Sequence, residues 1–410
     1  MTIPHDMSAR AVHAWRNTIF LVFALSGLGL ATWAARLPAI SAELDLRNDV
    51  VGFVILALSA GSILGLMAAP HLLRILGPRV GMRSMLILLA AGLALVGIGA
   101  DGLHLLALVV IGLAIFGFAM GAVDVLMNLD GTLVEKAAGR TLLPLMHAFF
   151  SLGTFAAAGI GTLAAMLEIP VIVHLLVIAG LVALTAAVGL GAIPPRSARP
   201  PLPEPVADLP GTRQRSVWFD PKLLLIGAIM LGMSFAEGAA NDWLALAVVR
   251  GHGLDPASGA LMLSVFTGAM FLGRVAGGPI LDRFGRVPVL LTAAVLSLAG
   301  LATFLLVETE PLMIAGTIAW ALGCSLGFPV AMSAAADHPT RSAERVSAAS
   351  MIGYGAFLVG PPLLGLVGEQ LGLLGALWIV FGLVALGSLA IPSLRPARPG
   401  PNSGADVPGA

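Results

Sequence analysis

Charged residues are scarce in this chain of 410 residues, where they make up 11% of the total, against about 25% in a soluble globular domain. Hydrophobic residues reach 58%, and the mean hydropathy is +0.98. The 22 basic and 22 acidic residues cancel, so nothing indicates a nucleic acid or another polyanion as a partner. The composition therefore excludes an ordinary soluble domain and indicates a chain that lies in a lipid bilayer.

Cysteine is almost absent, and so are the motifs of cofactor and metal chemistry. The single cysteine, Cys324, excludes a disulfide framework. The chain has no phosphate-binding loop, zinc pattern or calcium loop, so no cofactor or metal is expected, and ATP-driven transport would need another chain. Residues 323–327 fit the G-x-S-x-G motif of serine hydrolases, and residues 97–102 fit G-x-G-x-x-G, but neither follows a strand. An enzyme is not expected, and an intramembrane hydrolase using Ser325 is the weakest alternative.

What the chain has instead is long apolar runs. A membrane-spanning helix needs about 20 mostly apolar residues. The run after Arg16 has that length and lacks the small-residue cleavage site of a signal peptide, so it is expected to be the first span. Twelve spans are predicted, at 17–36, 50–70, 82–100, 104–128, 142–166, 170–192, 222–246, 257–281, 288–307, 311–334, 345–367 and 372–392. The fold class is an all-α integral membrane protein.

The chain divides into two similar halves. The sequence LMAAPHLLRILGPRVGMR after the second span echoes VAGGPILDRFGRVPV after the eighth, with Pro70 matching Pro279. Parallel six-helix repeats of this kind are a transporter architecture with a binding site between the halves. A proline-rich segment between them cannot bury itself and predicts an exposed linker. The expected domains are a first half at 1–192, a cytoplasmic linker at 193–221, a second half at 222–392 and a disordered tail at 393–410.

The basic residues indicate how the chain crosses the membrane. Cytoplasmic loops carry an excess of Lys and Arg. A cytoplasmic N-terminus puts all but four of the 22 basic residues on that side. The four exceptions are Arg36, Arg47, Arg250 and Arg274. We therefore expect a multi-pass protein of the cell (inner) membrane with both termini in the cytoplasm.

Four blocks of sequence carry a family resemblance. GGPILDRFGR at 277–286 resembles the loop signature of the major facilitator superfamily, and the first half holds a degenerate copy with Leu73 at the aspartate position. DVLMNLDGTLVEKAAGR with HAFFSLG, FAEGAANDWLAL and GYGAFLVGPPLLG are similar to the branch that includes the rhizopine-transport protein MosC. The resemblance implies a monomer of two pseudo-symmetric six-helix halves. It also implies that the fifth and eighth spans face each other, which would bring His147 close to Arg274.

Ionisable groups inside the spans are the candidates for proton coupling, because a charge in lipid is costly. Asp124 shares one helix face with Gly117, Gly121 and Asn128. Asp124 and Glu237 are expected to bind the coupling proton, and His147 is expected to exchange a proton with Asp124. The structural alternative is a buried acid capped by hydroxyl or backbone groups, and a histidine that only joins two helices.

Other polar and aromatic residues of the spans are candidates for substrate binding. The candidates are Asn128, Ser151, Asn241, Arg274, Trp33, Trp243 and Tyr354. Arg274, expected in the inner third of its span, could pair with Asp124 or attract an anionic group. Glu237 is expected in the outer half and Asp242 at the wet outer mouth. The rings could stack on a cyclic solute, although aromatic residues in such helices also serve for packing. Asp282, Arg283, Arg286 and Arg79 are expected to form the cytoplasmic gate.

These features predict a secondary active transporter of a small polar solute, such as a sugar, a cyclitol or an organic acid. Alternating access with proton symport is the favoured mechanism. The Gly-Pro run that drug antiporters carry in span five is absent here; a similar run, Gly360-Pro361-Pro362, lies in span eleven. Proton-driven efflux is the alternative, and a membrane sensor that binds its ligand without moving it is a further one.

Overall fold

A computed structural model describes residues 8–139, 142–195, 217–337 and 342–394. Every regular element in these residues is helical. The long elements are α1 (Ala9–Glu43), α2 (Asn48–Gly97), α3 (Leu106–Ala138), α4 (Leu143–Met166), α5 (Val171–Gly189), α6 (Pro221–Gly251), α7 (Pro256–Phe284), α8 (Arg286–Leu306), α9 (Glu310–Cys324), α10 (Gly327–Ala336) and α11 (Ser342–Ser388). Four short helical turns, η1 (Ile98–Gly102), η2 (Leu190–Ala192), η4 (Val217–Phe219) and η5 (Ile391–Leu394), connect or end them.

Within the described residues, ten helices are long and apolar enough to span a membrane, where the sequence predicts twelve. The difference arises in α2 and α11, each of which contains two predicted spans. Inside α2, Gly77 leaves the helical conformation with φ 71° and ψ 174°, and inside α11 Gly372 does the same with φ 74° and ψ 158°. Glycine adopts such positive φ values without steric cost. The predicted span 311–334 is in turn divided between α9 and α10.

Capping residues of the sequence set where α6 and α7 begin. Asp220 accepts hydrogen bonds from the backbone N–H groups of residues 222 and 223, at 2.9 and 3.4 Å. Asp255 accepts from those of residues 257 and 258, at 2.8 and 3.0 Å. A proline follows each aspartate at the first helical position, where its missing N–H costs nothing.

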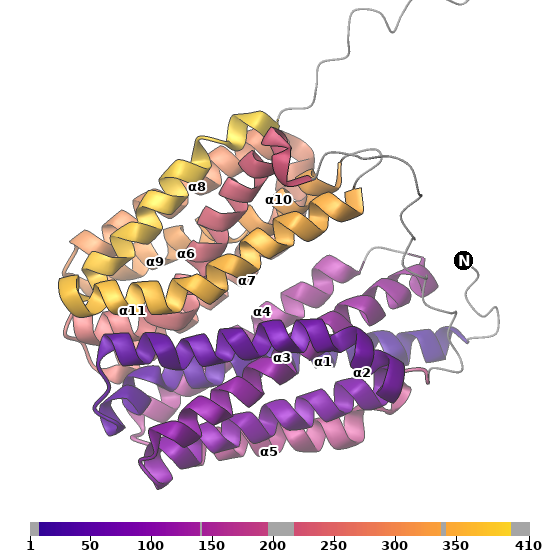
Figure 1. Ribbon diagram of the computed structural model, residues 1–410, viewed down its shortest axis with the longest axis horizontal. Helices are drawn as coiled ribbons and strands as arrows, with labels where there is room; N and C mark the ends of the chain where they lie inside the picture. The colour runs from indigo at the N-terminus through magenta and orange to yellow at the C-terminus, as the bar shows by residue number, and fades with distance from the viewer. Residues whose placement is uncertain (1–7, 140–141, 196–216, 338–341, 395–410) are drawn as a thin grey trace, which may run out of the picture.

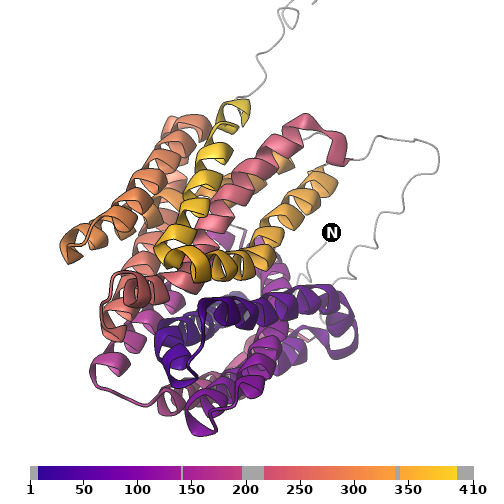
Figure 2. The ribbon, with the colours of Figure 1, turned by 60° about the vertical axis from the view of Figure 1, so that its left-hand side comes forward.

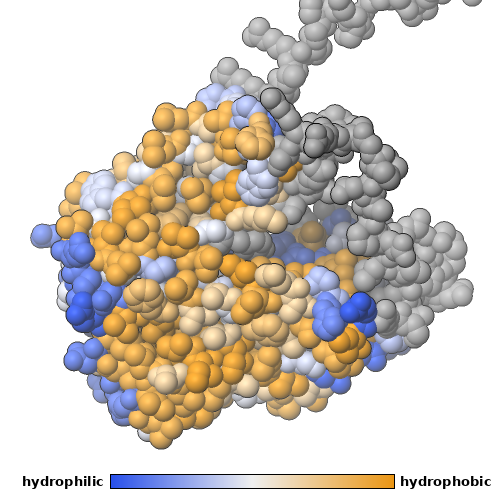
Figure 3. All heavy atoms as spheres, viewed as in Figure 1, coloured by the Kyte–Doolittle hydropathy of each residue, from blue (hydrophilic) through white to orange (hydrophobic). Residues whose placement is uncertain are grey.

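The helices form two bundles that lie side by side (Figures 1 and 2). The first bundle contains α1 to α5, and the second contains α6 to α11. The bundles meet where α2 packs on α11 and where α4 packs on α7. Most of the predicted linker 193–221 and tail 393–410 lies outside the described residues. Figure 3 shows apolar side chains over the flanks of both bundles, as lipid contact requires.

Glycines allow the helices to approach closely. A Cβ atom at Gly117 or Gly121 would lie 2.0 Å from the backbone oxygen of Leu58 or Ser62. This face of α3 therefore packs on α2 backbone to backbone, as small residues permit in lipid. Between the bundles, a Cβ atom at Gly52 of α2 would lie 2.7 Å from the backbone oxygen of Pro361 of α11. The α2–α11 contact is thus too tight for any larger residue at position 52.

The two ends of the structure differ. We call the end where α1 begins and η5 lies the terminal end, and the end where α1 gives way to α2 the far end (Figure 1). Helices α6 and α7 run in opposite directions between these ends. Residues near the middle of both helices, such as Glu237 and Arg274, therefore lie at a similar depth.

Candidate functional site

Arg274 occupies the contact between the two bundles. Its Nη2 donates a hydrogen bond to Oε1 of Glu237 at 2.7 Å, which makes an ion pair between α7 and α6. Its Nη1 donates to Oγ of Ser151 in α4 at 2.9 Å. The side chains of Arg274 and Glu237 are 23% and 17% exposed, respectively. A single guanidinium group therefore binds a carboxylate of its own bundle and also reaches the opposite bundle.

A second set of polar groups lies on the first bundle. The side-chain nitrogen of Asn128 donates to the backbone oxygen of Asp124 at 2.9 Å and to its carboxylate at 3.1 Å. The side-chain oxygen of Asn128 lies 3.0 Å from Nε2 of His147. Since an amide oxygen only accepts, this orientation puts a proton on Nε2. The amide of Asn128 thus joins the acid of α3 to the imidazole of α4.

Ser151 links the two sets. Its hydroxyl donates to the backbone oxygen of His147 at 3.2 Å while it accepts from Arg274. The result is one polar network that runs through α3, α4, α7 and α6. We call it the central polar network. Its members are Asp124, Asn128, His147, Ser151, Arg274 and Glu237.

Every member of the central polar network was a candidate in the sequence, but two details differ. Arg274 pairs with Glu237 and not with Asp124, because α7 packs beside α6 and reaches α4 rather than α3. The sequence also placed Glu237 in the outer half of its span and Arg274 in the inner third. The two side chains nevertheless meet, because α6 and α7 run in opposite directions and both residues lie near the middle of their helices.

The remaining substrate candidates are not part of the central polar network. Trp33 and Trp243 are each 1% exposed, so their rings are packed inside the bundles. Asn241 is half-buried, and its side chain makes no hydrogen bond with another described residue. Position 354 lies in α11, but the Tyr354 side chain is outside the described part of the structure.

The gate candidates lie at the terminal end. Arg286 pairs with Asp337 and donates to Oγ of Ser333 at 2.8 Å. Arg79 donates to the backbone oxygen of Ile193 at 2.6 Å. These contacts stay within one bundle. Asp282 is exposed and makes no hydrogen bond or ion pair among the described residues, so Asp337 is the acid that Arg286 binds. Arg283 lies over the ring of Phe284, with its guanidinium carbon 5.3 Å from the ring centre.

Arg250 at the far end joins the bundles and was missed as a site residue. Its Nη1 donates to the side-chain oxygen of Asn48 at 2.6 Å. Its Nη2 donates to the backbone oxygen of Leu46 at 2.6 Å and to the hydroxyl of Ser41. The feature in the sequence that pointed to it was its place, with Arg47, as one of two cations in predicted external loops that otherwise carry acids.

Glu369 makes the matching contact from the second bundle. Its carboxylate lies 3.2 Å from Nε of Arg47 and accepts from the backbone N–H of Asn48 at 3.0 Å. These bonds and those of Arg250 are called the far-end contact below. Deeper in the bundle, Oγ of Ser59 donates to the backbone oxygen of Phe357 at 2.9 Å. At the terminal end, no hydrogen bond or ion pair joins the bundles within the described residues.

A pocket lies between α6 and α11, close to the first bundle. It is small, with room for about one water molecule. Aromatic rings and small residues line it, together with one carboxylate, that of Asp242. The sequence predicted a wetted Asp242 at the mouth of the protein, but the structure leaves it half-buried. Within the described residues, no cluster of three or more His, Cys, Asp or Glu side chains could hold a metal ion.

Comparison with known proteins agrees with this architecture. The family model of the Major Facilitator Superfamily matches residues 242–408. An uncharacterised MFS-type transporter of Yersinia pestis is 30% identical over 376 residues, which cover 89% of this chain and 91% of that one. Membrane protein MosC of Rhizobium meliloti is 26% identical, over 92% of this chain and 90% of that one.

Among solved structures, a mutant of the nucleoside transporter NupG superposes with a TM-score of 0.69. The match covers 94% of this chain and 99% of that one at 16% identity, so it concerns the fold alone. Sequence and fold thus agree on one assignment, and the chain belongs to the major facilitator superfamily.

Proposed function

We propose that the protein is a secondary active transporter that moves a small polar solute together with protons by alternating access. The central polar network is the observation that carries this proposal. It holds an arginine, two carboxylates, an imidazole, an amide and a hydroxyl at the contact of two helix bundles. Polar and ionisable groups inside a membrane protein cost free energy, so their presence there indicates a functional site.

The chain then crosses the membrane twelve times. At 1.5 Å per residue, the 50 residues of α2 would make a straight helix of about 75 Å, whereas a bilayer core is about 30 Å thick. We infer that α2 and α11 each make two crossings that meet at Gly77 and Gly372. We keep the domain boundaries predicted from the sequence as our proposal. We also propose that the protein lies in the inner membrane with its terminal end in the cytoplasm. The far end would then face outward.

The far-end contact supports a state closed to the outside. Arg250 and Glu369 join the bundles there, and no polar contact of the described residues joins them at the terminal end. In the opposite state these bonds would break, and the gate candidates Arg79, Asp282, Arg283 and Arg286 would approach one another at the terminal end. Rocking of two halves around a central site is the motion this fold supports.

The chemistry of the network favours a polar cargo. Ser151, Asn128 and the nearby Asn241 offer hydroxyl and amide groups that can bond the hydroxyl groups of a sugar or cyclitol. A solute carboxylate could replace Glu237 on Arg274, since a guanidinium binds carboxylates in two-pronged fashion. Trp33, Trp243 and Tyr354 remain proposed stacking groups for a cyclic solute, which requires that a movement of the bundles uncover the packed rings of Trp33 and Trp243. A sugar, a cyclitol or a small organic acid is therefore the proposed cargo.

Protons would act on the two carboxylates. A proton on Glu237 would remove its charge and free Arg274 for the solute. Binding of the proton and binding of the solute would therefore be linked. Asp124 would exchange its proton with His147, and Asn128, which is hydrogen-bonded to both side chains, would hold them near each other. Proton-driven efflux uses the same groups in the opposite direction and is the second candidate. A sensor that binds without transport is the third.

The test is flux in proteoliposomes driven by a pH gradient, with internal pH recorded for sugars, cyclitols and organic acids. We expect one class of compound to move protons, and we expect Asp124→Asn and Glu237→Gln to abolish that movement. Asp101→Asn, which changes an acid that accepts from the backbone N–H of Ile172 inside the first bundle, serves as a control for general damage. Coupling that survives in both carboxamide variants would refute the site. Compound binding without flux would favour the sensor.

A further inference from the structure

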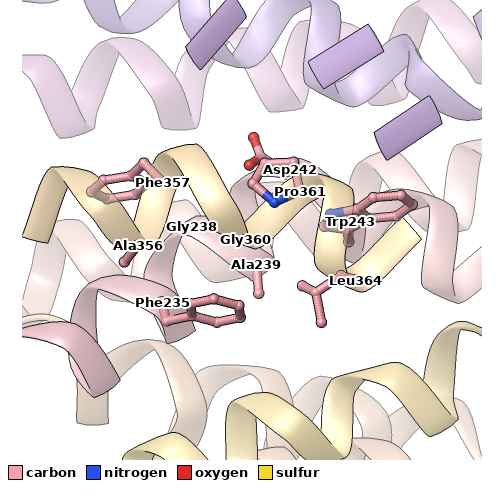
Figure 4. Close-up of a pocket in the computed structure, with 10 residues that line it drawn as sticks. All are labelled: Phe235, Gly238, Ala239, Asp242, Trp243, Ala356, Phe357, Gly360, Pro361 and Leu364. Carbon is pink, nitrogen blue, oxygen red and sulfur yellow. The ribbon is translucent and has the colours of Figure 1, made fainter. Parts of the chain in front are cut away.

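Asp242 is a carboxylate without a partner at the boundary between the bundles. Figure 4 shows its side chain on the rim of the pocket between α6 and α11, with the oxygens turned toward the first bundle. The rings of Phe235, Trp243 and Phe357 line the same pocket. The Asp242 side chain makes no hydrogen bond or ion pair with any described residue. An ionised carboxylate held in such surroundings would lack a counter-ion and would have little water around it.

The charged groups on the surrounding elements are already engaged elsewhere. On its own helix, Glu237 pairs with Arg274 of α7, and Arg250 binds the α1–α2 connection. On α11, Glu369 binds Arg47, and near the terminal end Arg345 pairs with Asp220. On α1, Arg36 donates to the backbone oxygen of Ile169 at 2.7 Å. On α2, Asp49 accepts from Arg47 at 3.0 Å. None of these cations makes an ion pair or a hydrogen bond with the side chain of Asp242.

The closed far end separates the pocket from the outer solution. Ser59 of α2 bonds to the backbone of Phe357, which lines the pocket. Further out along α2, Gly52 lies against Pro361, another lining residue. The far-end contact then closes the gap beyond them. When the bundles separate at this end, the same movement would bring water to Asp242.

We propose that Asp242 is a second proton site, distinct from the central polar network, and that it links proton binding to closure of the far end. The closed state accommodates the neutral acid, because its surroundings supply no charge and little water. The open state accommodates the carboxylate, because water solvates it. A metal ion does not fit, since the described pocket offers one carboxylate among apolar walls, whereas hard cations need about six oxygen ligands. This inference rests on the proposed function in one respect, namely that the proton bound at Asp242 would be used in transport.

Closure can be measured by the reactivity of a cysteine at the α2–α11 contact. Cys324 is buried and can be replaced by Ala, after which Ser59→Cys supplies the only thiol. A membrane-impermeant thiol reagent should react at a rate that tracks the open population, corrected for thiolate content at each pH. One linked proton changes the ratio of the two states at most about tenfold per pH unit. We expect the corrected rate to fall as the outer pH drops from about 8 to about 5, a range that brackets the titration of a desolvated carboxyl group.

Two variants of Asp242 and one control decide the outcome. Asp242→Asn imitates the neutral acid, so its rate should be low and independent of pH. Asp242→Glu can still titrate and should keep a pH-dependent rate, which separates lost titration from misfolding. Asp255→Asn changes an exposed far-end acid that lies in water. It should leave the slope, which is the change of the corrected labelling rate with pH, as in the protein that keeps Asp255.

An unchanged slope in Asp242→Asn would overturn the proposal, and so would a rate in the unmodified protein that depends on Na⁺ but not on pH. A slope lost in Asp124→Asn but kept in Asp242→Asn would place the linked proton in the central polar network and also overturn it. A flat Asp242→Asn profile in a protein that moves no compound would support the proton site while refuting proton-coupled transport.

Discussion

Removal of the Arg250 side chain should open the far end. Three hydrogen bonds from its guanidinium reach the α1–α2 connection of the opposite bundle, at Ser41, Leu46 and Asn48. In the state that opens outward these bonds cannot form, because the bundles separate there. The bonds therefore contribute to the difference in free energy between the two states and not only to folding.

The size of the effect follows from the number of bonds and their exposure. A hydrogen bond contributes about 1 kcal/mol net, and more when one partner is charged. Arg250 is an exposed residue, so solvent screening reduces the advantage of its charge. Three such bonds amount to about 2–3 kcal/mol, which at about 1.4 kcal/mol per tenfold is a shift of roughly 30- to 150-fold in the ratio of open to closed states. Arg250→Lys should recover little of this, because an ammonium group cannot reproduce the planar fork of donors.

The assay is again the reaction of Ser59→Cys with an impermeant thiol reagent in a Cys324→Ala background. Arg250→Ala should raise the labelling rate by the factor above if the protein rests mainly closed. Lys222→Ala, which removes an exposed cation at the terminal end, is the matched control and should leave the rate unchanged. An unchanged rate in Arg250→Ala would refute the assignment of this end as the closed gate.

Three further predictions concern packing, charge and capping. Gly52→Val should also increase far-end labelling, because its Cβ would meet a backbone oxygen at 2.7 Å, whereas Gly180→Val has open space and should have no effect. Arg274→Gln should lower the melting temperature in detergent, because breaking a largely buried ion pair costs up to about 3–5 kcal/mol. The double variant with Glu237→Gln should recover stability but not transport. A double variant as unstable as the single variant would contradict the pairing. Asp255→Ala should cost about 1 kcal/mol at neutral pH. Hydrogen bonds from the backbone and hydroxyl of Ser258 lower the pKa of Asp255, so this stabilisation is present above the pKa of the unfolded chain and is lost as pH falls through that of the folded protein. Melting curves of the variant and the native protein should converge in acid, and a constant difference would argue against the cap.

Local properties of the sequence predicted most of the helices. Long apolar runs identified the segments that can enter a membrane, and in the structure Asp220 and Asp255 before prolines begin α6 and α7 within a residue or two of the predicted spans. These features depend on residues within a few positions of one another. The joining of two predicted spans in α2 and in α11 was not predicted, because it depends on how the chain passes through single glycines.

The members of the central polar network were likewise found from the sequence, since a charged or polar residue stands out within an apolar run. Their partners were not. Arg274 binds Glu237 and Ser151, which are 37 and 123 positions away, and Arg250 binds Asn48 at a distance of 202 positions. Only the packing of α7 between α6 and α4, and of the two bundles at the far end, decides these contacts. The same packing leaves Asp242 half-buried without a partner, because hydropathy shows that a residue lies in the membrane but not which side chains surround it.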